Sequence, residues 1–129
     1  MILDTTAIID LLHGNNEVVN KIKELQRKNI PLVITSISVF EIWQGTKDIA
    51  DREKMERIYY LLESLGNLSF DIPSAEEAGS IHAYLKKEGK IIEPEDSMIA
   101  GIAKIHHETI LTRNIKHFQR ISGLKLESY

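Results

Sequence analysis

The segment that decides the fold joins a strand directly to a helix, and it reads Leu32-Val33-Ile34-Thr35-Ser36-Ile37-Ser38-Val39-Phe40-Glu41-Ile42-Trp43. Residues 32–35 form a continuous, largely apolar run rich in β-branched side chains, which is typical of a strand buried on both faces. Residues 36–38 then lead into a helix that runs through Trp43. A strand buried on both faces indicates a parallel sheet whose two sides are covered by helices.

The same alternation of strand and helix extends outward from this segment in both directions. Apolar spacing and turn residues predict further strands at residues 1–3, 68–72, 109–112 and 124–126. They predict further helices at residues 7–12, 16–28, 51–65, 73–87, 94–105 and 114–120. Strands that alternate with helices throughout predict the α/β fold class, with one domain spanning residues 1–129 and helices on both faces of the sheet.

Composition excludes several classes of function. The chain has 129 residues and no cysteine, so disulfides, thiolate metal sites and thiol nucleophiles are excluded. Residues 1–4 lack the basic and apolar regions of a signal peptide, and no apolar run reaches the roughly 18 residues of a membrane span. We therefore expect a cytoplasmic protein with no membrane partner. The net charge of −3 argues against coating nucleic acid by bulk charge, but permits an enzyme that holds one phosphate through a metal ion.

Three acids and one amide fall beyond the carboxyl ends of the predicted strands, where parallel α/β sheets bind ligands. Asp4 ends the first strand, Glu41 lies one to two turns past the second, and Asp96 lies in the first turn of the helix before the fourth. Asn114 follows the fourth strand. If the carboxylates converge, two unit charges about 4 Å apart cost roughly 4 kcal/mol at an effective dielectric of about 20. A divalent cation removes that cost, and carboxylates suit Mg²⁺ or Mn²⁺.

Each acid taken alone also has a local explanation. Ser38 and Glu41 have the spacing of a capping box, in which Glu41 would serve only its own helix. Asp96 would interact favourably with the positive end of a helix dipole, and Asp4 would cap the helix that follows it. The metal-site hypothesis therefore depends on the three acids coming together in the fold.

Four segments, in their order along the chain, resemble the PIN-domain family, and in particular its VapC-type toxins. They are Ile2-Leu3-Asp4-Thr5-Thr6, Thr35-Ser36-Ile37-Ser38-Val39-Phe40-Glu41-Ile42, Glu93-Pro94-Glu95-Asp96-Ser97-Met98-Ile99-Ala100, and Leu111-Thr112-Arg113-Asn114 followed by Phe118. The resemblance covers nearly the whole chain and implies a three-layer α/β/α sandwich with four to five strands in a mainly parallel sheet. It also implies a Mg²⁺- or Mn²⁺-dependent endoribonuclease that hydrolyses RNA with metal-activated water, as the toxin of a type II toxin–antitoxin system neutralised by a cognate antitoxin.

The resemblance also assigns roles to the four candidate residues. The acidic motif of the family falls on Asp4, Glu41 and Asp96, which are therefore the expected metal ligands and catalytic residues. A fourth catalytic position, often Asp in the family, falls on Asn114. The family also often has an acid just before the Phe118 position, where this chain has His117. These two departures lead us to expect one firmly held ion rather than two.

Neighbouring polar residues receive supporting roles. Thr6 and Asn114 would orient the metal ligands or metal-bound waters. Arg113 would either stabilise developing phosphate charge or pair with an acid at the surface. We expect Asp10 to be structural, and we expect none of the histidines to be catalytic, because His117 and the others have no partner at ligand spacing.

Two other classes of function stay open. A metal-dependent phosphatase or a receiver-like domain would share the aspartate after the first strand, but it needs a lysine near a later strand end, and none occurs between Thr112 and Lys116. A non-catalytic interaction module would keep the fold without the metal. For the toxin that the resemblance implies, we also expect a homodimer, built on helical faces that carry residues such as Trp43 or Tyr59.

Overall fold

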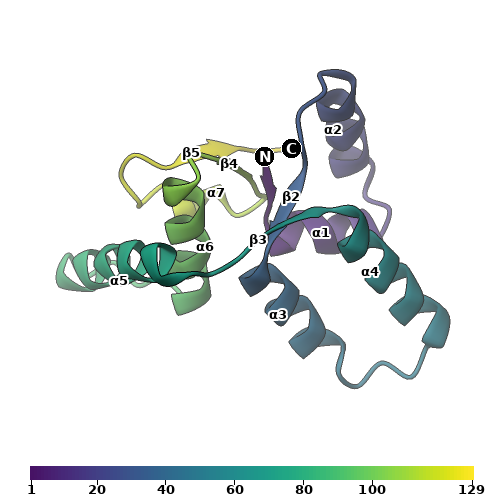
Figure 1. The fold of residues 1–129 in the computed structure, drawn as a ribbon, viewed down its shortest axis with the longest axis horizontal. Coiled ribbons are helices and arrows are strands. Elements are labelled where there is room, and N and C mark those ends of the chain that lie inside the picture. Colours follow the sequence, from purple (N-terminus) through teal and green to yellow (C-terminus); the bar gives the residue numbers. More distant parts are fainter.

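The computed structural model describes all 129 residues and places a five-stranded sheet between two groups of helices (Figure 1). The elements in chain order are β1 (Ile2–Leu3), α1 (Thr5–Leu12), α2 (Asn16–Arg27), β2 (Val33–Thr35), α3 (Ser36–Thr46), α4 (Arg52–Ser64), β3 (Gly66–Leu68), α5 (Ile72–Lys87), α6 (Pro94–Ile105), β4 (Thr109–Leu111), α7 (Ile115–Phe118) and β5 (Lys125–Glu127). The strands lie in the order β3-β2-β1-β4-β5, and every neighbouring pair is parallel. The predicted α/β fold with a parallel sheet is confirmed.

The two faces of the sheet carry separate hydrophobic cores. Leu3 and Leu111 face the core shared with α1, α2, α3 and α4, whereas Ile2 and Ile110 face the core shared with α5, α6 and α7. Successive side chains of a strand point to opposite faces, so a strand covered on both sides must be apolar at every position. This requirement explains why the central strands read as continuous apolar runs. No helix in the structure combines the length and apolar character needed to cross a membrane.

The third strand lies earlier in the chain than predicted. The predicted helix at residues 51–65 ends as expected, at Ser64, but the strand predicted at residues 68–72 is wrong, because β3 is Gly66–Leu68 and pairs with β2. The residues that follow β3 make hydrogen bonds with helices instead. The Phe70 N–H donates to Ser36 Oγ at 3.0 Å, and Asp71 caps α5 by accepting from the Ser74 N–H at 3.0 Å. The elements predicted at residues 114–120 and 124–126 exist as α7 and β5, with bounds shifted by one to two residues.

A glycine sets the close approach of α5 and α6. A Cβ added to Gly101 would lie 2.6 Å from the Ser74 carbonyl oxygen and 2.8 Å from the Ala78 Cβ. We expect Gly101→Ala to lower the free energy of unfolding by about 1–3 kcal/mol, as overpacking usually does. Gly79→Ala in α5 is the matched control, because a Cβ there meets nothing within 4 Å and should stabilise the helix by about 0.5–1 kcal/mol. Thermal unfolding of the three proteins tests this, and equal melting temperatures for the two variants would contradict it.

Candidate active site

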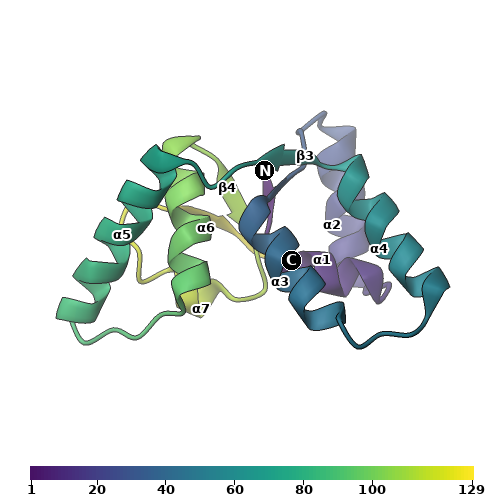
Figure 2. The ribbon, with the colours of Figure 1, turned by 60° about the horizontal axis from the view of Figure 1, so that its bottom comes forward.

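The candidate site lies where the strand order reverses. The chain runs from β1 through β2 to β3 on one side and then crosses to β4 on the other side of β1. Open α/β sheets bind ligands at such a switch point, beyond the carboxyl ends of the strands. The register pairs Leu3 with Leu111, and the Asp4 N–H donates to the Leu111 carbonyl at 3.0 Å, so Asp4 lies beside Thr112. Figure 2 shows α1, α3 and α6 meeting around this edge of the sheet.

The Asp4 carboxylate is buried and held in a fixed orientation. Its side chain is 3% exposed, and its Oδ2 accepts hydrogen bonds from the hydroxyls of Thr112 at 2.8 Å and Thr6 at 2.9 Å. These hydroxyls in turn accept from the backbone N–H groups of Asn114 at 2.9 Å and Arg113 at 3.3 Å. Asp4 occupies the N-cap position of α1 but makes no side-chain capping bond, so the capping explanation is wrong. Both hydroxyls engage Oδ2, which leaves Oδ1 free for a ligand.

Glu41 faces α1 rather than the end of its own helix. Its Oε2 accepts a hydrogen bond from the Thr5 hydroxyl at 2.5 Å. The N-cap of α3 is Thr35, whose hydroxyl accepts from the Ser38 N–H at 3.0 Å. The capping-box explanation for Ser38 and Glu41 is therefore wrong, because the helix begins earlier than that spacing requires.

Asp96 has a partner that the sequence did not indicate. The Nδ1 atom of His117 lies 3.2 Å from Asp96 Oδ2 and 3.0 Å from Asn114 Nδ2. The expectation that His117 has no partner at ligand spacing is wrong, because α7 follows β4 and turns His117 back toward α6. The spacing of three residues between Asn114 and His117 places those two side chains on one face of a helical turn, but it gives no signal for the contact with Asp96.

The three candidate acids influence one another electrostatically. Burial raises the pKa of Glu41 above its usual range, and the negative charges of Asp4 and Asp96 raise it further, against the hydrogen bond from Thr5. Burial likewise raises the pKa of Asp96, and Asp4 adds to this effect while His117 opposes it. The sheet edge therefore gathers carboxylates from three elements, each partly removed from water and repelling the others.

A second group of polar side chains closes the site on the side of α1. Asp10 is 6% exposed and accepts from Arg113 Nη1 at 2.9 Å and from the Tyr129 hydroxyl at 2.7 Å. Burial and the bond to Asp10 raise the pKa of the Tyr129 phenol, which therefore stays protonated and donates. Both carboxylate oxygens of Asp10 are thus engaged, in agreement with the structural role expected for it. Arg113 pairs with this acid near the surface, one of its two expected roles.

The donor set suits a hard divalent cation, although its ligands are not preassembled. No three acidic or histidine side chains form a ready-made group of metal ligands. Mg²⁺ commonly binds through one or two carboxylates and keeps several waters, so a complete protein cage is not required. Asp4 offers a fixed carboxylate with one free oxygen. Burial is the main cause of the raised pKa values of Glu41 and Asp96, and Asp4 adds a repulsion that a cation would relieve. The residues present therefore fit the group that the resemblance implies.

The fold and the arrangement of the acids together define a PIN domain. The sequence matches the PIN domain family over residues 1–124, and the chain belongs to that family. This family assignment confirms the resemblance seen in the four sequence segments.

Individual relatives carry the VapC name. Ribonuclease VapC3 of Methanocaldococcus jannaschii is 37% identical over 101 residues, covering 78% of this chain and 95% of that protein. The tRNA(fMet)-specific endonuclease VapC of Salmonella typhimurium is 28% identical over 128 residues, covering 98% of this chain and 96% of that protein. The structure is similar, with a TM-score of 0.89 and 27% identity, to a chain in the crystal structure of VapBC2 from Rickettsia felis bound to a DNA fragment from their promoter. That match covers 99% of this chain and 97% of the other.

Proposed function

We propose that this protein is a metal-dependent endoribonuclease and the toxin of a toxin–antitoxin pair. The observation that carries the proposal is the Asp4 carboxylate, which two threonine hydroxyls hold at the switch point of the sheet, with Glu41 and Asp96 on the adjoining helices. The names of the relatives, ribonuclease VapC3 and tRNA(fMet)-specific endonuclease VapC, support RNA as the substrate. The whole chain, residues 1–129, forms the functional unit in this proposal.

Each side chain of the site has a separate role in the proposed phosphodiester hydrolysis. A divalent cation, Mg²⁺ or Mn²⁺, supplies Lewis acidity toward a phosphodiester oxygen and activates water for attack when it is bound. Asp4 and Asp96 would hold the cation, and Glu41 would bind it directly or through water. Thr6 and Thr112 keep Asp4 in place through their bonds to Oδ2. Asn114 adds an amide without charge, which favours a single ion.

Metal-dependent RNA cleavage tests the proposal directly. The purified protein should cleave RNA in millimolar Mg²⁺ or Mn²⁺ and should stop cleaving when a chelator is added, since the proposed attack on the phosphodiester depends on the bound cation. A generic phosphate ester serves as the control substrate and should stay intact. Release of phosphate from that ester without RNA cleavage would favour a phosphatase. Failure to bind Mn²⁺ in calorimetry, together with intact RNA, would favour a non-catalytic interaction module.

An apolar groove next to Glu41 provides a place for the antitoxin. A cavity of about 180 Å³ lies between α1, α3 and α4, and its lining includes Ile9, Leu12, Gly45 and Ile49 as well as Glu41. Ile9 remains exposed although it is a large hydrophobic side chain. We propose that an antitoxin segment fills the apolar part of this groove and presents a basic side chain to the carboxylates. The similar chain belongs to the VapBC2 structure, and that assembly supports the proposal that this protein also has a protein partner.

A larger side chain in this groove should block binding of the antitoxin without affecting RNA cleavage. A Cβ at Gly45 meets nothing within 4 Å, so Gly45→Leu should fold normally while its side chain projects into the groove. We expect the variant to lose co-purification with its antitoxin and to keep RNA cleavage. Gly79→Leu on α5, which also has open space at its Cβ, is the matched control. Unchanged co-purification of Gly45→Leu would move the partner to another surface.

The proposed homodimer uses the exposed aromatic side chains of α4. Trp43 packs against the core, whereas Tyr59 is 52% exposed and makes an edge-to-face contact with Tyr60. Of the two aromatic residues suggested by the sequence, Tyr59 therefore remains available to a second copy of the chain. Sedimentation of the purified protein measures the mass of the assembly and should give that of a dimer.

A further inference from the structure

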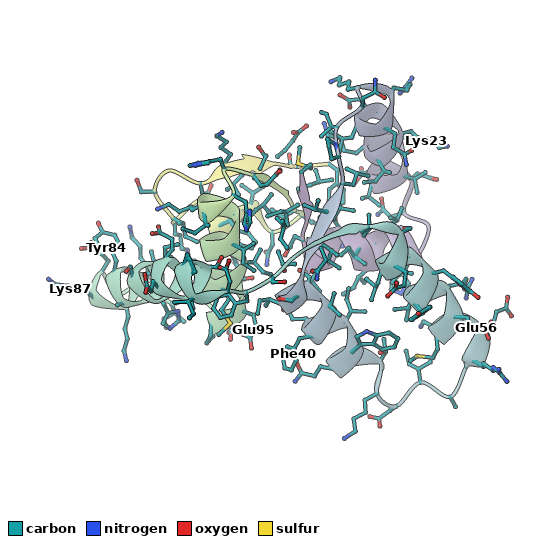
Figure 3. All side chains as sticks on the ribbon, in the orientation of Figure 1. Lys23, Phe40, Glu56, Tyr84, Lys87 and Glu95 are labelled. Atoms are coloured by element: carbon teal, nitrogen blue, oxygen red, sulfur yellow. The ribbon has the colours of Figure 1, made fainter.

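A basic cavity lies at the far end of α5, outside the candidate active site. It has a volume of about 420 Å³ and lies where α5 ends, Gly89 turns the chain at a φ of +69°, and the loop to α6 begins. Figure 3 shows Lys87 at this end of α5, on the opposite side of the molecule from Lys23 on α2. The cavity has two lysines and a histidine in its lining and no acid, and the lining residues are His82, Lys86, Gly89, Lys90, Ile91 and Ile92.

The cavity adjoins the candidate site across the first turn of α6. The Nδ1 atom of His82, in the cavity wall, lies 2.9 Å from the hydroxyl of Ser97. Ser97 follows Asp96 directly, and consecutive helical side chains point about 100° apart around the helix axis. Asp96 therefore faces the carboxylates while Ser97 faces α5. A strand of RNA that crosses the N-terminal end of α6 would meet both the acids and the lysines.

More positive charge follows in the chain after α6. Residues 109–126 contain no aspartate or glutamate but include two lysines and two arginines. One of them, Arg120, links the two basic segments, because its Nη1 donates to the Ile91 carbonyl in the loop before α6 at 2.5 Å. Lys116 is exposed on α7 next to His117. Arg113 is paired with Asp10, whereas Lys116 and Arg120 have no acidic partner and lie one helical turn apart in sequence.

We infer that this basic flank, defined as Lys86, Lys90, Lys116 and Arg120, binds the phosphate backbone of RNA next to the scissile bond. The inference rests on the proposed ribonuclease function and names the surface that holds its substrate. A cluster of carboxylates repels a polyanion, so affinity for RNA must come from cations outside the cluster. Lys116 directly precedes His117, which contacts Asp96. Lys86 lies one helical turn after His82, which contacts Ser97. The flank therefore adjoins the acids, and contacts to phosphate make the binding independent of base sequence.

Salt dependence of RNA binding tests the basic flank. The probe is a fluorescein-labelled single-stranded RNA of about 20 nucleotides, titrated at several KCl concentrations in chelator so that it stays intact. In Lys86→Gln/Lys90→Gln the slope of log K against log salt should become shallower by about 1.4, since each phosphate contact on a single strand contributes about 0.7. The matched control is Lys23→Gln/Arg27→Gln, which removes the same charge from exposed positions on α2. Its slope should equal that of the wild type.

Cleavage assays separate this inference from the proposed function. With Mn²⁺ present, the lysine variant should show a raised KM for the long RNA and an unchanged kcat, and it should cleave a dinucleotide as the wild type does. If the wild type cleaves no RNA, the proposed function fails, whereas the binding titration still tests the flank. If RNA is cleaved and the lysine variant matches the α2 control in both slope and KM, the basic flank is not the RNA-binding surface. Circular dichroism confirms that both variants are folded.

Discussion

Asp4→Asn, Glu41→Gln and Asp96→Asn should each remove nearly all metal-dependent RNA cleavage. Each substitution keeps the shape of the side chain and removes the charge that would hold a divalent cation. Replacing a residue that hydrogen-bonds to a metal ligand usually lowers metal affinity or activity by about 10–100-fold. Replacing a ligand itself should therefore lower the activity by about 100-fold or more. The effect should be large for Asp4, because its carboxylate is buried and oriented by Thr6 and Thr112. Cleavage rates of a labelled RNA in Mn²⁺ provide the measurement.

The control for these variants is Glu63→Gln, which makes the same chemical change on the exposed surface of α4. It should keep the activity of the wild type. Circular dichroism should show that all four variants are folded, since none removes packed volume. Full activity in any two of the three candidate variants, or undiminished cleavage in chelator, would exclude the proposed site.

The central strands and the candidate acids could be predicted because one physical rule governs both. A parallel strand covered on both faces must be apolar at every position, so β1, β2 and β4 stand out in the sequence as short apolar runs. Polar residues that directly follow such runs lie at one edge of the sheet. Asp4 and Thr112-Arg113-Asn114 follow two adjacent strands, and the observed register of Leu3 with Leu111 places Asp4 beside Thr112, whose hydroxyl also accepts from the Asn114 N–H.

The parts that sequence analysis missed depend on contacts between distant segments. β3 is an edge strand of which Gly66 and Asn67 are exposed, so it carries no apolar signature, and the strand was expected two residues later, at residues 68–72. The role of Thr112 as a donor to Asp4 spans 108 residues and follows only from the strand register. His117 meets Asp96 because α7 folds back beside α6, which no local pattern encodes. Pairings of this kind require the tertiary structure.

The second large effect concerns stability and distinguishes a metal ligand from a helix-start acid at Asp96. As a helix-start acid alone, Asp96 would stabilise the protein, and its replacement by Asn would cost about 0.3–1 kcal/mol. The folded-state pKa of Asp96 is instead raised by burial and by Asp4, so its carboxyl favours folding when protonated at low pH. That contribution is lost as the pH rises through the raised pKa. At neutral pH the charged carboxyl therefore destabilises the metal-free fold, and Asp96→Asn should melt higher than the wild type.

Metal should reverse this order, because a cation binds the folded state alone. A ligand present at about 100 times its dissociation constant adds about 2.7 kcal/mol to the free energy of unfolding. The wild type should gain this stability in millimolar Mg²⁺ or Mn²⁺, while Asp96→Asn should gain much less. Four thermal melts at neutral pH, each protein with chelator and with metal, provide the measurement. If Asp96→Asn melts lower than the wild type in chelator and gains as much stability from metal, Asp96 is only a helix-start acid. In that case the charge of Asp96 neither destabilises the metal-free fold nor contributes to binding of the cation.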